Sequence, residues 1–88
     1  MKLKYHFSIC EVAGDTVAIA VGDDAVRFNG MIRLNQTARC LFEALREDTN
    51  EEKLVDCLTA DFAVGRQEAL ASTEAFIRQL RENGLLEE

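Results

Sequence analysis

The spacing of apolar residues changes at Asn35, and this change constrains the fold more than any other feature. Before it, one set of side chains recurs at every second position, as in a half-buried strand: Phe28, Ile32 and Leu34, with Gly30 in register. After it, apolar residues recur at helical spacing: Ala38, Leu41, Phe42 and Leu45. Asn35 itself suits a helix N-cap, because its side-chain oxygen can accept from free N–H groups of the first turn. The sequence therefore predicts a strand over residues 27–34 that runs directly into a helix over residues 36–46.

The remaining segments predict two more strands and two more helices. Period-two patterns over residues 7–12 and 16–21 are each followed by a turn signal, Gly14-Asp15 and Gly22-Asp23-Asp24. Thr49 stands three residues before Glu52, the spacing of a capping box that opens a second helix. A third helix is expected from near Gly65, with a Schellman end in which Gly84 is left-handed and Leu85 folds back onto Leu80. Its predicted core side is Ala69, Thr73, Phe76, Ile77 and Leu80.

Three short strands cannot bury a sheet face unless helices pack on it. The expected class is α+β, a winged-helix-like domain in which a three-stranded antiparallel sheet is followed by three helices. We expect residues 1–88 to form a single domain, because a chain of this length supports one modest core.

Charge and hydropathy narrow the expected partners. The net charge is −6, and residues 43–88 carry five basic and twelve acidic side chains. Nucleic-acid affinity depends largely on phosphate neutralisation by Lys and Arg, so this balance disfavours DNA as a partner. The longest apolar run, residues 17–21, is too short to cross a bilayer, and no secretory signal is evident. We expect a cytoplasmic protein with no membrane partner.

The sequence holds no recognisable catalytic constellation. Its single histidine, His6, lacks a predicted orienting partner, and the paired carboxylates fall at turns, helix starts or the C-terminus. The three cysteines, Cys10, Cys40 and Cys57, are widely spaced with no C-x-x-C pair, which argues against a zinc site or a disulfide framework. The expectation is a protein that is not an enzyme, with no catalytic residues, cofactor or metal.

A binding surface remains as the functional prediction. An open sheet edge presents unpaired amides and carbonyls, to which an extended peptide can add itself as a further strand. The strand over residues 27–34 suits this role, since Gly30 permits close backbone approach, while Arg27 and Arg33 favour an acidic peptide. The alternative from the residues alone is that Gly30 marks a bulge and that both arginines are ordinary surface residues.

Three segments of the chain resemble the PqqD family, small proteins named for pyrroloquinoline quinone biosynthesis. They are the run Phe28-Asn29-Gly30-Met31-Ile32-Arg33-Leu34-Asn35-Gln36-Thr37, the run Thr49-Asn50-Glu51-Glu52-Lys53-Leu54-Val55, and the run from Ala75 to Leu86. Leu34-Asn35-x-Thr37 and Phe76-Ile77-x-x-Leu80 followed by Gly84-Leu85-Leu86 are the most specific parts, and their order and spacing together carry the resemblance.

The resemblance implies a peptide-recognition element for ribosomally made, post-translationally modified peptides. Such a domain binds the leader of a precursor peptide as an added strand beside its third strand, in a cleft bounded by the third helix. It delivers the peptide to a modifying enzyme, often a radical S-adenosylmethionine maturase. The positions implicated here, together with the sheet-edge residues, are Arg27, Phe28, Asn29, Gly30, Met31, Ile32, Arg33, Leu34, Ser72, Ala75, Phe76 and Gln79.

Three positions qualify this assignment. The spacing of Phe76 with Thr73 and Leu80 suits a core residue as well as a cleft wall. Many family members carry an acidic and then an aliphatic residue where this chain has Ser72-Thr73, so its leader preference is expected to differ. Gly65 stands where an Asp-like cap is more usual, which leaves that helix start looser.

Two other functions remain open from the sequence. A winged-helix DNA-binding regulator has the same order of elements, but needs a basic recognition helix. An assembly module would pair its edge strands into a homodimer and ignore any peptide.

Overall fold

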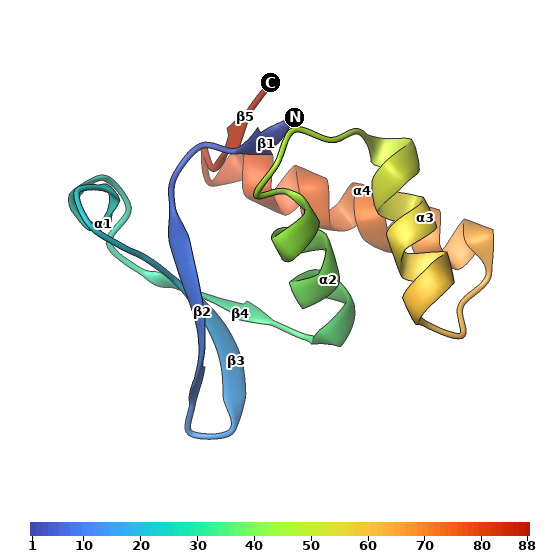
Figure 1. The fold of residues 1–88 in the computed structure, drawn as a ribbon, viewed down its shortest axis with the longest axis horizontal. Coiled ribbons are helices and arrows are strands. Elements are labelled where there is room, and N and C mark those ends of the chain that lie inside the picture. Colours follow the sequence, from blue (N-terminus) through green and yellow to red (C-terminus); the bar gives the residue numbers. More distant parts are fainter.

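The computed structural model describes residues 1–88 and contains five strands and four helices (Figure 1). The elements in chain order are β1 (Lys2–Leu3), β2 (Phe7–Val12), β3 (Asp15–Ala20), α1 (Asp24–Arg27), β4 (Met31–Leu34), α2 (Gln36–Ala44), α3 (Glu51–Asp61), α4 (Arg66–Glu82) and β5 (Leu86–Glu87). Strands β2, β3 and β4 form an antiparallel sheet in that order, and the three longer helices follow it in the chain. The predicted α+β class, with a three-stranded antiparallel sheet followed by three helices, is confirmed.

The hairpin between β2 and β3 projects away from the helices (Figure 1). Its pairing runs from Phe7 opposite Ala20 to Val12 opposite Asp15. The two turn residues, Ala13 and Gly14, have φ angles of 52° and 86°. Positive φ at both positions gives a two-residue turn the twist that antiparallel strands require. The turn thus begins one residue earlier than predicted, and Asp15 is already part of β3.

The strand predicted over residues 27–34 is shorter than expected. Residues 24–27 form the one-turn helix α1, and β4 begins only at Met31. The carboxylate of Asp24 holds this turn in place, since it accepts from the backbone N–H of His6 at 2.8 Å and from Arg27 at 3.2 Å. Arg27 is therefore a helical residue, and only Met31–Leu34 of the predicted peptide-binding strand pairs with β3. Within β4 the predicted alternation is confirmed, with Ile32 and Leu34 buried and Met31 and Arg33 exposed.

Small residues of the central strand form the face of the sheet that meets the helices. Ala18 and Ala20 are almost completely buried there, and Ala20 lies opposite Phe7 in the register. These small side chains leave room for the Phe7 ring, which packs edge-to-face on Phe42 of α2 at a centroid distance of 5.1 Å. An aromatic side chain from the edge strand β2 thus helps to fix the sheet to α2, together with Ile32 and Leu34 of β4 in the same core.

Four phenylalanines form a continuous aromatic row through the core. Phe28 packs on Phe7 at 5.8 Å between ring centroids, and Phe42 packs on Phe76 of α4 at 6.4 Å, both edge-to-face. With the contact between Phe7 and Phe42, the row joins the approach to β4 with the middle of α4. Both segments contribute to the candidate site below.

The helix caps decide where the helices begin. Asn35 caps α2 as predicted, because its Oδ1 accepts from the N–H of Ala38 at 2.8 Å. The predicted capping box at Thr49 is wrong, since the N-cap of α3 is Asn50, whose Oδ1 accepts from the N–H of Lys53 at 2.9 Å. Thr49 is instead engaged with the N-terminus: its N–H donates to the carbonyl of Met1, and its carbonyl accepts from the Met1 ammonium group.

The start and end of α4 agree with the sequence prediction. Gly65 is its N-cap and makes no side-chain cap bond. At the other end Gly84 has a φ of 68°, its N–H donates to Arg81 O at 2.9 Å, and the N–H of Leu85 donates to Leu80 O at 2.9 Å. These are the two hydrogen bonds of a Schellman motif. Leu80 and Leu85 are both almost fully buried, as expected for its hydrophobic contact.

A second, two-stranded sheet was not predicted from the sequence. It pairs β1 with β5, Lys2 opposite Glu87 and Leu3 opposite Leu86, and so places the two chain ends side by side (Figure 1). The N–H of Leu3 and that of Lys4 also donate to the carbonyls of Leu45 and Leu85, both at 2.8 Å. These bonds attach the first residues to the end of α2 and the end of α4. None of the helices is long and apolar enough to span a bilayer.

Candidate functional site

The outer edge of β4 is open. In the sheet order β2-β3-β4 this strand has a partner on one side only. None of the main-chain hydrogen bonds outside regular helices and strands involves Met31–Leu34. The edge is therefore not covered by a segment of the chain itself, and its main-chain groups can pair with an added strand.

Two hollows lie beside this edge, between β4 and the helices. The first has a volume of about 300 Å³, and residues from the end of β4, the start of α2 and the middle of α4 line it: Arg33, Asn35, Thr37, Ala38, Leu41, Ser72, Ala75, Phe76 and Gln79. The second has a volume of about 220 Å³ and lies toward the end of α4, lined by Phe28, Met31, Ile32, Arg33, Gln79, Leu80, Asn83 and Leu85. Arg33 and Gln79 line both hollows, so the two form one groove along β4, which we call the β4 groove.

Arg33 is the only charged residue that lines the β4 groove. Its guanidinium lies 3.7 Å from a carboxylate oxygen of Asp15, and its side chain is 83% exposed. An ion pair this long and exposed is worth little, so the guanidinium stays accessible to a second anion. The groove therefore offers one accessible cation among apolar and neutral polar groups.

Eight of the twelve site residues predicted from the sequence line the β4 groove. They are Phe28, Met31, Ile32, Arg33, Ser72, Ala75, Phe76 and Gln79. Phe76 has both roles that its spacing allowed, since it is 8% exposed, belongs to the core and lines the first hollow.

The other four predicted site residues do not line the groove. Leu34 faces the core, while Asn29 and Gly30 are exposed in the segment before β4. Arg27 is paired with Asp24 at 3.2 Å on α1. A Cβ added at Gly30 would meet only the Phe28 ring, at 3.8 Å, so no close contact within the chain requires a glycine there.

The cluster around Asp24 fixes the segment that leads into β4. The backbone N–H of His6 lowers the pKa of the Asp24 carboxyl, and the His6 ring and Arg27 act in the same direction. The His6 ring nitrogen Nδ1 lies 3.1 Å from the carboxylate, although the histidine side chain itself is 91% exposed. This cluster stabilises α1 and makes no contribution to the lining of the groove.

Sequence reasoning missed the groove residues contributed by α2 and by the end of α4. Asn35, Thr37, Ala38 and Leu41 come from the first turns of α2, and Leu80, Asn83 and Leu85 from the end of α4. For α4 a signal was available, because Ser72, Ala75, Gln79 and Asn83 follow each other at three- or four-residue steps along one helix face. For the start of α2 the only signal was the family motif Leu34-Asn35-x-Thr37, since the cap and the apolar stripe of this helix are explained by helix formation and core packing.

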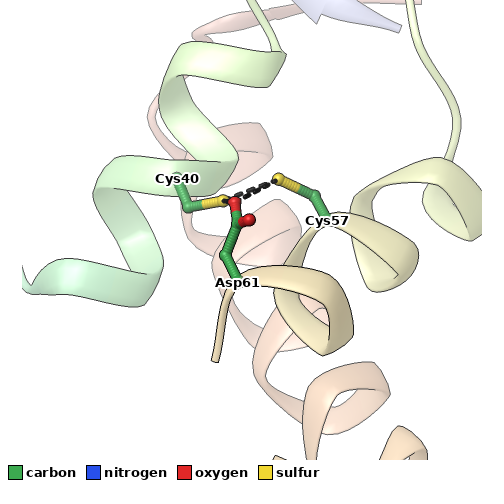
Figure 2. Close-up of side chains that lie close together, drawn as sticks. All are labelled: Cys40, Cys57 and Asp61. Carbon is green, nitrogen blue, oxygen red and sulfur yellow. Dashed lines mark hydrogen bonds between the residues drawn. The ribbon is translucent and has the colours of Figure 1, made fainter. Parts of the chain in front are cut away.

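Away from the β4 groove, one group of residues could hold a metal ion (Figure 2). Cys40 of α2 and Cys57 and Asp61 of α3 bring their ligand atoms within 4.8 Å of one another. Burial raises the pKa of the Cys40 thiol to about 12, and its contacts with Cys57 and Asp61 act in the same direction. Cys40 is therefore a protonated thiol at neutral pH, which makes it a poor nucleophile.

Fold and groove together define the class: an α+β protein with an open strand edge beside a groove walled by helices. A sequence model of the family described as "Coenzyme PQQ synthesis protein D (PqqD)" matches residues 15–86. The chain belongs to the PqqD family, as its three motif segments predicted. No curated protein matches the sequence.

Two solved structures share the fold along nearly the whole chain. One is TbiB1 in complex with the TbiA(beta) leader peptide, with a TM-score of 0.74, 21% sequence identity, and coverage of 99% of this chain and 95% of that one. The other is a lasso peptide synthetase B1 complexed with the leader peptide, with a TM-score of 0.69, 23% identity, and coverage of 96% and 93%. At these identities the similarity establishes the fold.

Proposed function

We propose that this protein is a non-catalytic adaptor that captures the leader of a ribosomally made precursor peptide and presents it to a modifying enzyme. The observation that carries the proposal is the open edge of β4 beside the β4 groove. Support comes from membership of the PqqD family and from the two structural neighbours, each of which is in complex with a leader peptide.

The leader would bind as a fourth strand next to β4. An added strand takes its affinity from main-chain hydrogen bonds and its selectivity from pockets for alternate side chains. The two hollows meet this need, because they lie one after the other along β4 and share Arg33 and Gln79 at their junction. Side chains on one face of an added strand are two residues apart, about 7 Å, so two of them would enter neighbouring hollows.

The charge of the groove indicates what the leader should carry. Arg33 is accessible and has only a weak partner in Asp15, whereas the protein as a whole has a net charge of −6. An acidic residue between the two side chains that enter the hollows would meet this guanidinium. Opposite charges at this point would set the register of the leader more than its affinity.

The bound peptide would be handed to a partner enzyme, which we propose to be a radical S-adenosylmethionine maturase on the basis of the family. Within this proposal residues 1–88 act as one peptide-recognition domain in the cytoplasm. A homodimer formed through the edge of β4 would compete with the leader for that strand.

The surface charges favour a peptide over DNA as the ligand. Arg39, one of the two basic residues predicted on the helix over residues 36–46, is paired with Glu43 at 3.2 Å and Glu11 at 4.0 Å. On α3, Lys53 stands beside Glu51, Glu52 and Asp56. Neither helix presents the cluster of free cations that phosphate binding requires.

The precursor peptide is first sought among the short reading frames beside the gene for this protein, and the test uses a synthetic copy of its leader. Isotope-labelled protein is titrated with that leader, and amide shifts are expected at Met31–Leu34 and along the groove side of α4, at Ser72, Ala75 and Gln79. Shifts confined to other surfaces would contradict the proposal.

Backbone methylation separates strand addition from other binding modes. A leader N-methylated at the alternate residues whose N–H groups face β4 should lose most of its affinity, because those main-chain bonds are removed. The matched control is methylation at the intervening residues, whose N–H groups point away from the sheet, and this peptide should still bind. Equal affinities for the two peptides would show that the leader does not pair with β4.

A further inference from the structure

The side chains of Cys40, Cys57 and Asp61 converge from two neighbouring helices (Figure 2). The two Sγ atoms lie 2.6 Å apart, and Asp61 Oδ2 lies 3.6 Å from Cys40 Sγ and 3.9 Å from Cys57 Sγ. Cys57 and Asp61 are four residues apart, so both project from the same face of α3. Cys40 reaches them from α2, 17 residues earlier in the chain than Cys57.

Asp61 is exposed and stands where a helix favours a cation over an anion. It is the last residue of α3, where the helix dipole is negative, and the last turn of this helix carries no basic residue. The protein has eight ion pairs, and all of them involve other carboxylates. Asp61 therefore has no lysine or arginine partner. Its carboxylate is instead directed at two sulfur atoms, which offer it only weak S–H donors.

From this geometry we propose that Cys40, Cys57 and Asp61 form a binding site for a thiophilic divalent cation such as Zn²⁺. Two thiolates and one carboxylate are a ligand set that Zn²⁺ accepts, with water or a partner side chain in the fourth position. Both thiols release their protons to solvent on binding. The three ligands carry three negative charges, and the cation compensates two of them next to the negative end of α3.

Small side-chain movements are enough to admit the ion. Zinc–sulfur bonds are about 2.3 Å long, so two sulfurs on one tetrahedral ion lie roughly 3.7 Å apart, and the two Sγ atoms must separate by about 1 Å. The distances from Asp61 to both sulfurs already match such an arrangement. A disulfide between the two cysteines would use only two of the three groups and would leave the carboxylate uncompensated, which favours the cation.

The site is separate from the proposed peptide-binding groove, because none of its three residues lines that groove. A bound ion would nevertheless affect one wall of that groove. The ion would link α2 to α3, and α2 supplies Thr37, Ala38 and Leu41 to the first hollow.

Cobalt provides the direct test, since Co²⁺ replaces Zn²⁺ and shows a sulfur-to-cobalt charge-transfer absorption in the near ultraviolet. The full chain, reduced and freed of metal, is titrated with Co²⁺ and then with Zn²⁺. We expect one equivalent of Co²⁺ per chain, the absorption of two thiolates, and displacement by Zn²⁺. Absence of this absorption in the native sequence would overturn the proposal.

Variants identify the ligands. Cys40→Ser and Cys57→Ser should abolish the absorption, while Cys10→Ser, on strand β2, is the matched control and should retain it. Asp61→Asn changes an exposed residue, leaves the fold intact by far-ultraviolet circular dichroism, and should weaken binding at least tenfold. Unchanged affinity in Asp61→Asn, or loss of binding in Cys10→Ser, would contradict the assigned ligand set.

A final measurement distinguishes the ion from a disulfide. Oxidised glutathione can take one hydrogen from each thiol, forming the Cys40–Cys57 bond and two molecules of reduced glutathione. Formation of the disulfide lowers the mass of the protein by two hydrogens, which mass spectrometry detects. Saturating Zn²⁺ should prevent this decrease in mass. If the disulfide forms at the same rate with and without Zn²⁺, the pair is a redox site and the metal proposal fails.

Discussion

The two edges of the three-stranded sheet both have main-chain groups free to pair with an added strand, and they differ in the side chains that surround them. Strands β2 and β4 each have a partner on one side only, and no main-chain hydrogen bond outside the sheet involves Phe7–Val12 or Met31–Leu34. β2 is the longer of the two, with six residues against four. Counting available main-chain groups would therefore favour β2 as the place for an added strand.

The groove reverses this preference. Met31, Ile32 and Arg33 of β4 line the β4 groove, whereas Phe7 is the only residue of β2 that lines any hollow. An edge supplies hydrogen bonds that any extended peptide can use, and only neighbouring pockets distinguish one peptide from another. The shorter edge is thus the better candidate for a recognition site, because residues of α2 and α4 line hollows beside it.

The largest expected effect is on the free energy of unfolding, and it comes from truncating a side chain of α4 that lines the groove beside β4. Phe76→Ala should lower the free energy of unfolding by about 3–5 kcal/mol, because the ring is buried, packs on Phe42 and lines the first hollow. Urea denaturation measures this loss. Val12→Ala at the end of β2, where the side chain is 43% exposed, is the control and should cost less than about 1 kcal/mol. Similar losses in the two variants would show that the groove wall is not part of the core.

The second effect concerns charge at the two edges. Arg33→Glu should weaken binding of a leader with an acidic residue about tenfold, or about 1.4 kcal/mol, because an exposed attraction becomes a repulsion. Titration calorimetry checks this. Ser8→Glu puts a new charge on the same sheet face of β2, since Ser8 pairs with Ile19 and Ile19 with Met31, and should leave affinity unchanged. Ser8→Glu changes the net charge by −1 and Arg33→Glu by −2, so a loss of free energy about half as large in Ser8→Glu would mean that net charge governs binding, and not the position of Arg33.

A smaller effect tests the helix behind β4. The Thr73 hydroxyl on α4 is fully buried and has no hydrogen-bond partner. Thr73→Val should raise the free energy of unfolding by about 1 kcal/mol, because it removes an unsatisfied polar group at nearly constant volume. Ser72→Val on the exposed groove side of the same helix should give no such gain. Chemical denaturation of the pair decides this, and a destabilised Thr73→Val would reveal a bond to the hydroxyl.

The smallest effect concerns the segment that leads into β4 and has no equivalent at β2. Hydrogen bonding to His6 lowers the pKa of Asp24 below its ordinary value of 3.8. A carboxyl with a lowered folded-state pKa stabilises the fold above the ordinary value, and this stability is lost as pH falls toward the lower value. The melting temperature should therefore fall over this acidic range, and Asp24→Asn should remove that part of the pH dependence. The same acid profile in both proteins would contradict the role of this cluster.

The sequence predicted those parts of the fold that depend on local spacing. The alternation at Ile32 and Leu34, the cap at Asn35 and the Schellman end at Gly84 each need only a few neighbouring residues, and all were confirmed. The predicted core side of α4 was also confirmed, with Ala69, Thr73, Phe76, Ile77 and Leu80 buried.

The parts that were wrong or missed depend on partners far away in the chain. The predicted strand starts late, at Met31, because residues 24–27 form α1, in which Asp24 accepts from the N–H of His6, eighteen residues before it. Asn50 replaces Thr49 as a cap because Thr49 is engaged with Met1, and the residues of β1 are too few to give a periodic signal. The approach of Cys40 to Cys57 follows from the packing of α2 on α3 and leaves no trace in local spacing.

The pairing of β1 with β5 makes this protein suited to circular permutation. Its two ends are adjacent strands, so a short flexible linker could join Glu88 to Met1 without strain. New ends could then be opened at the exposed tip of the hairpin, between Ala13 and Gly14, on the part of the sheet that projects away from α4 (Figure 1). A rearranged chain of this kind would carry a fused partner next to Asp15, whose carboxylate lies 3.7 Å from the Arg33 guanidinium, and so would place that partner close to one end of the β4 groove.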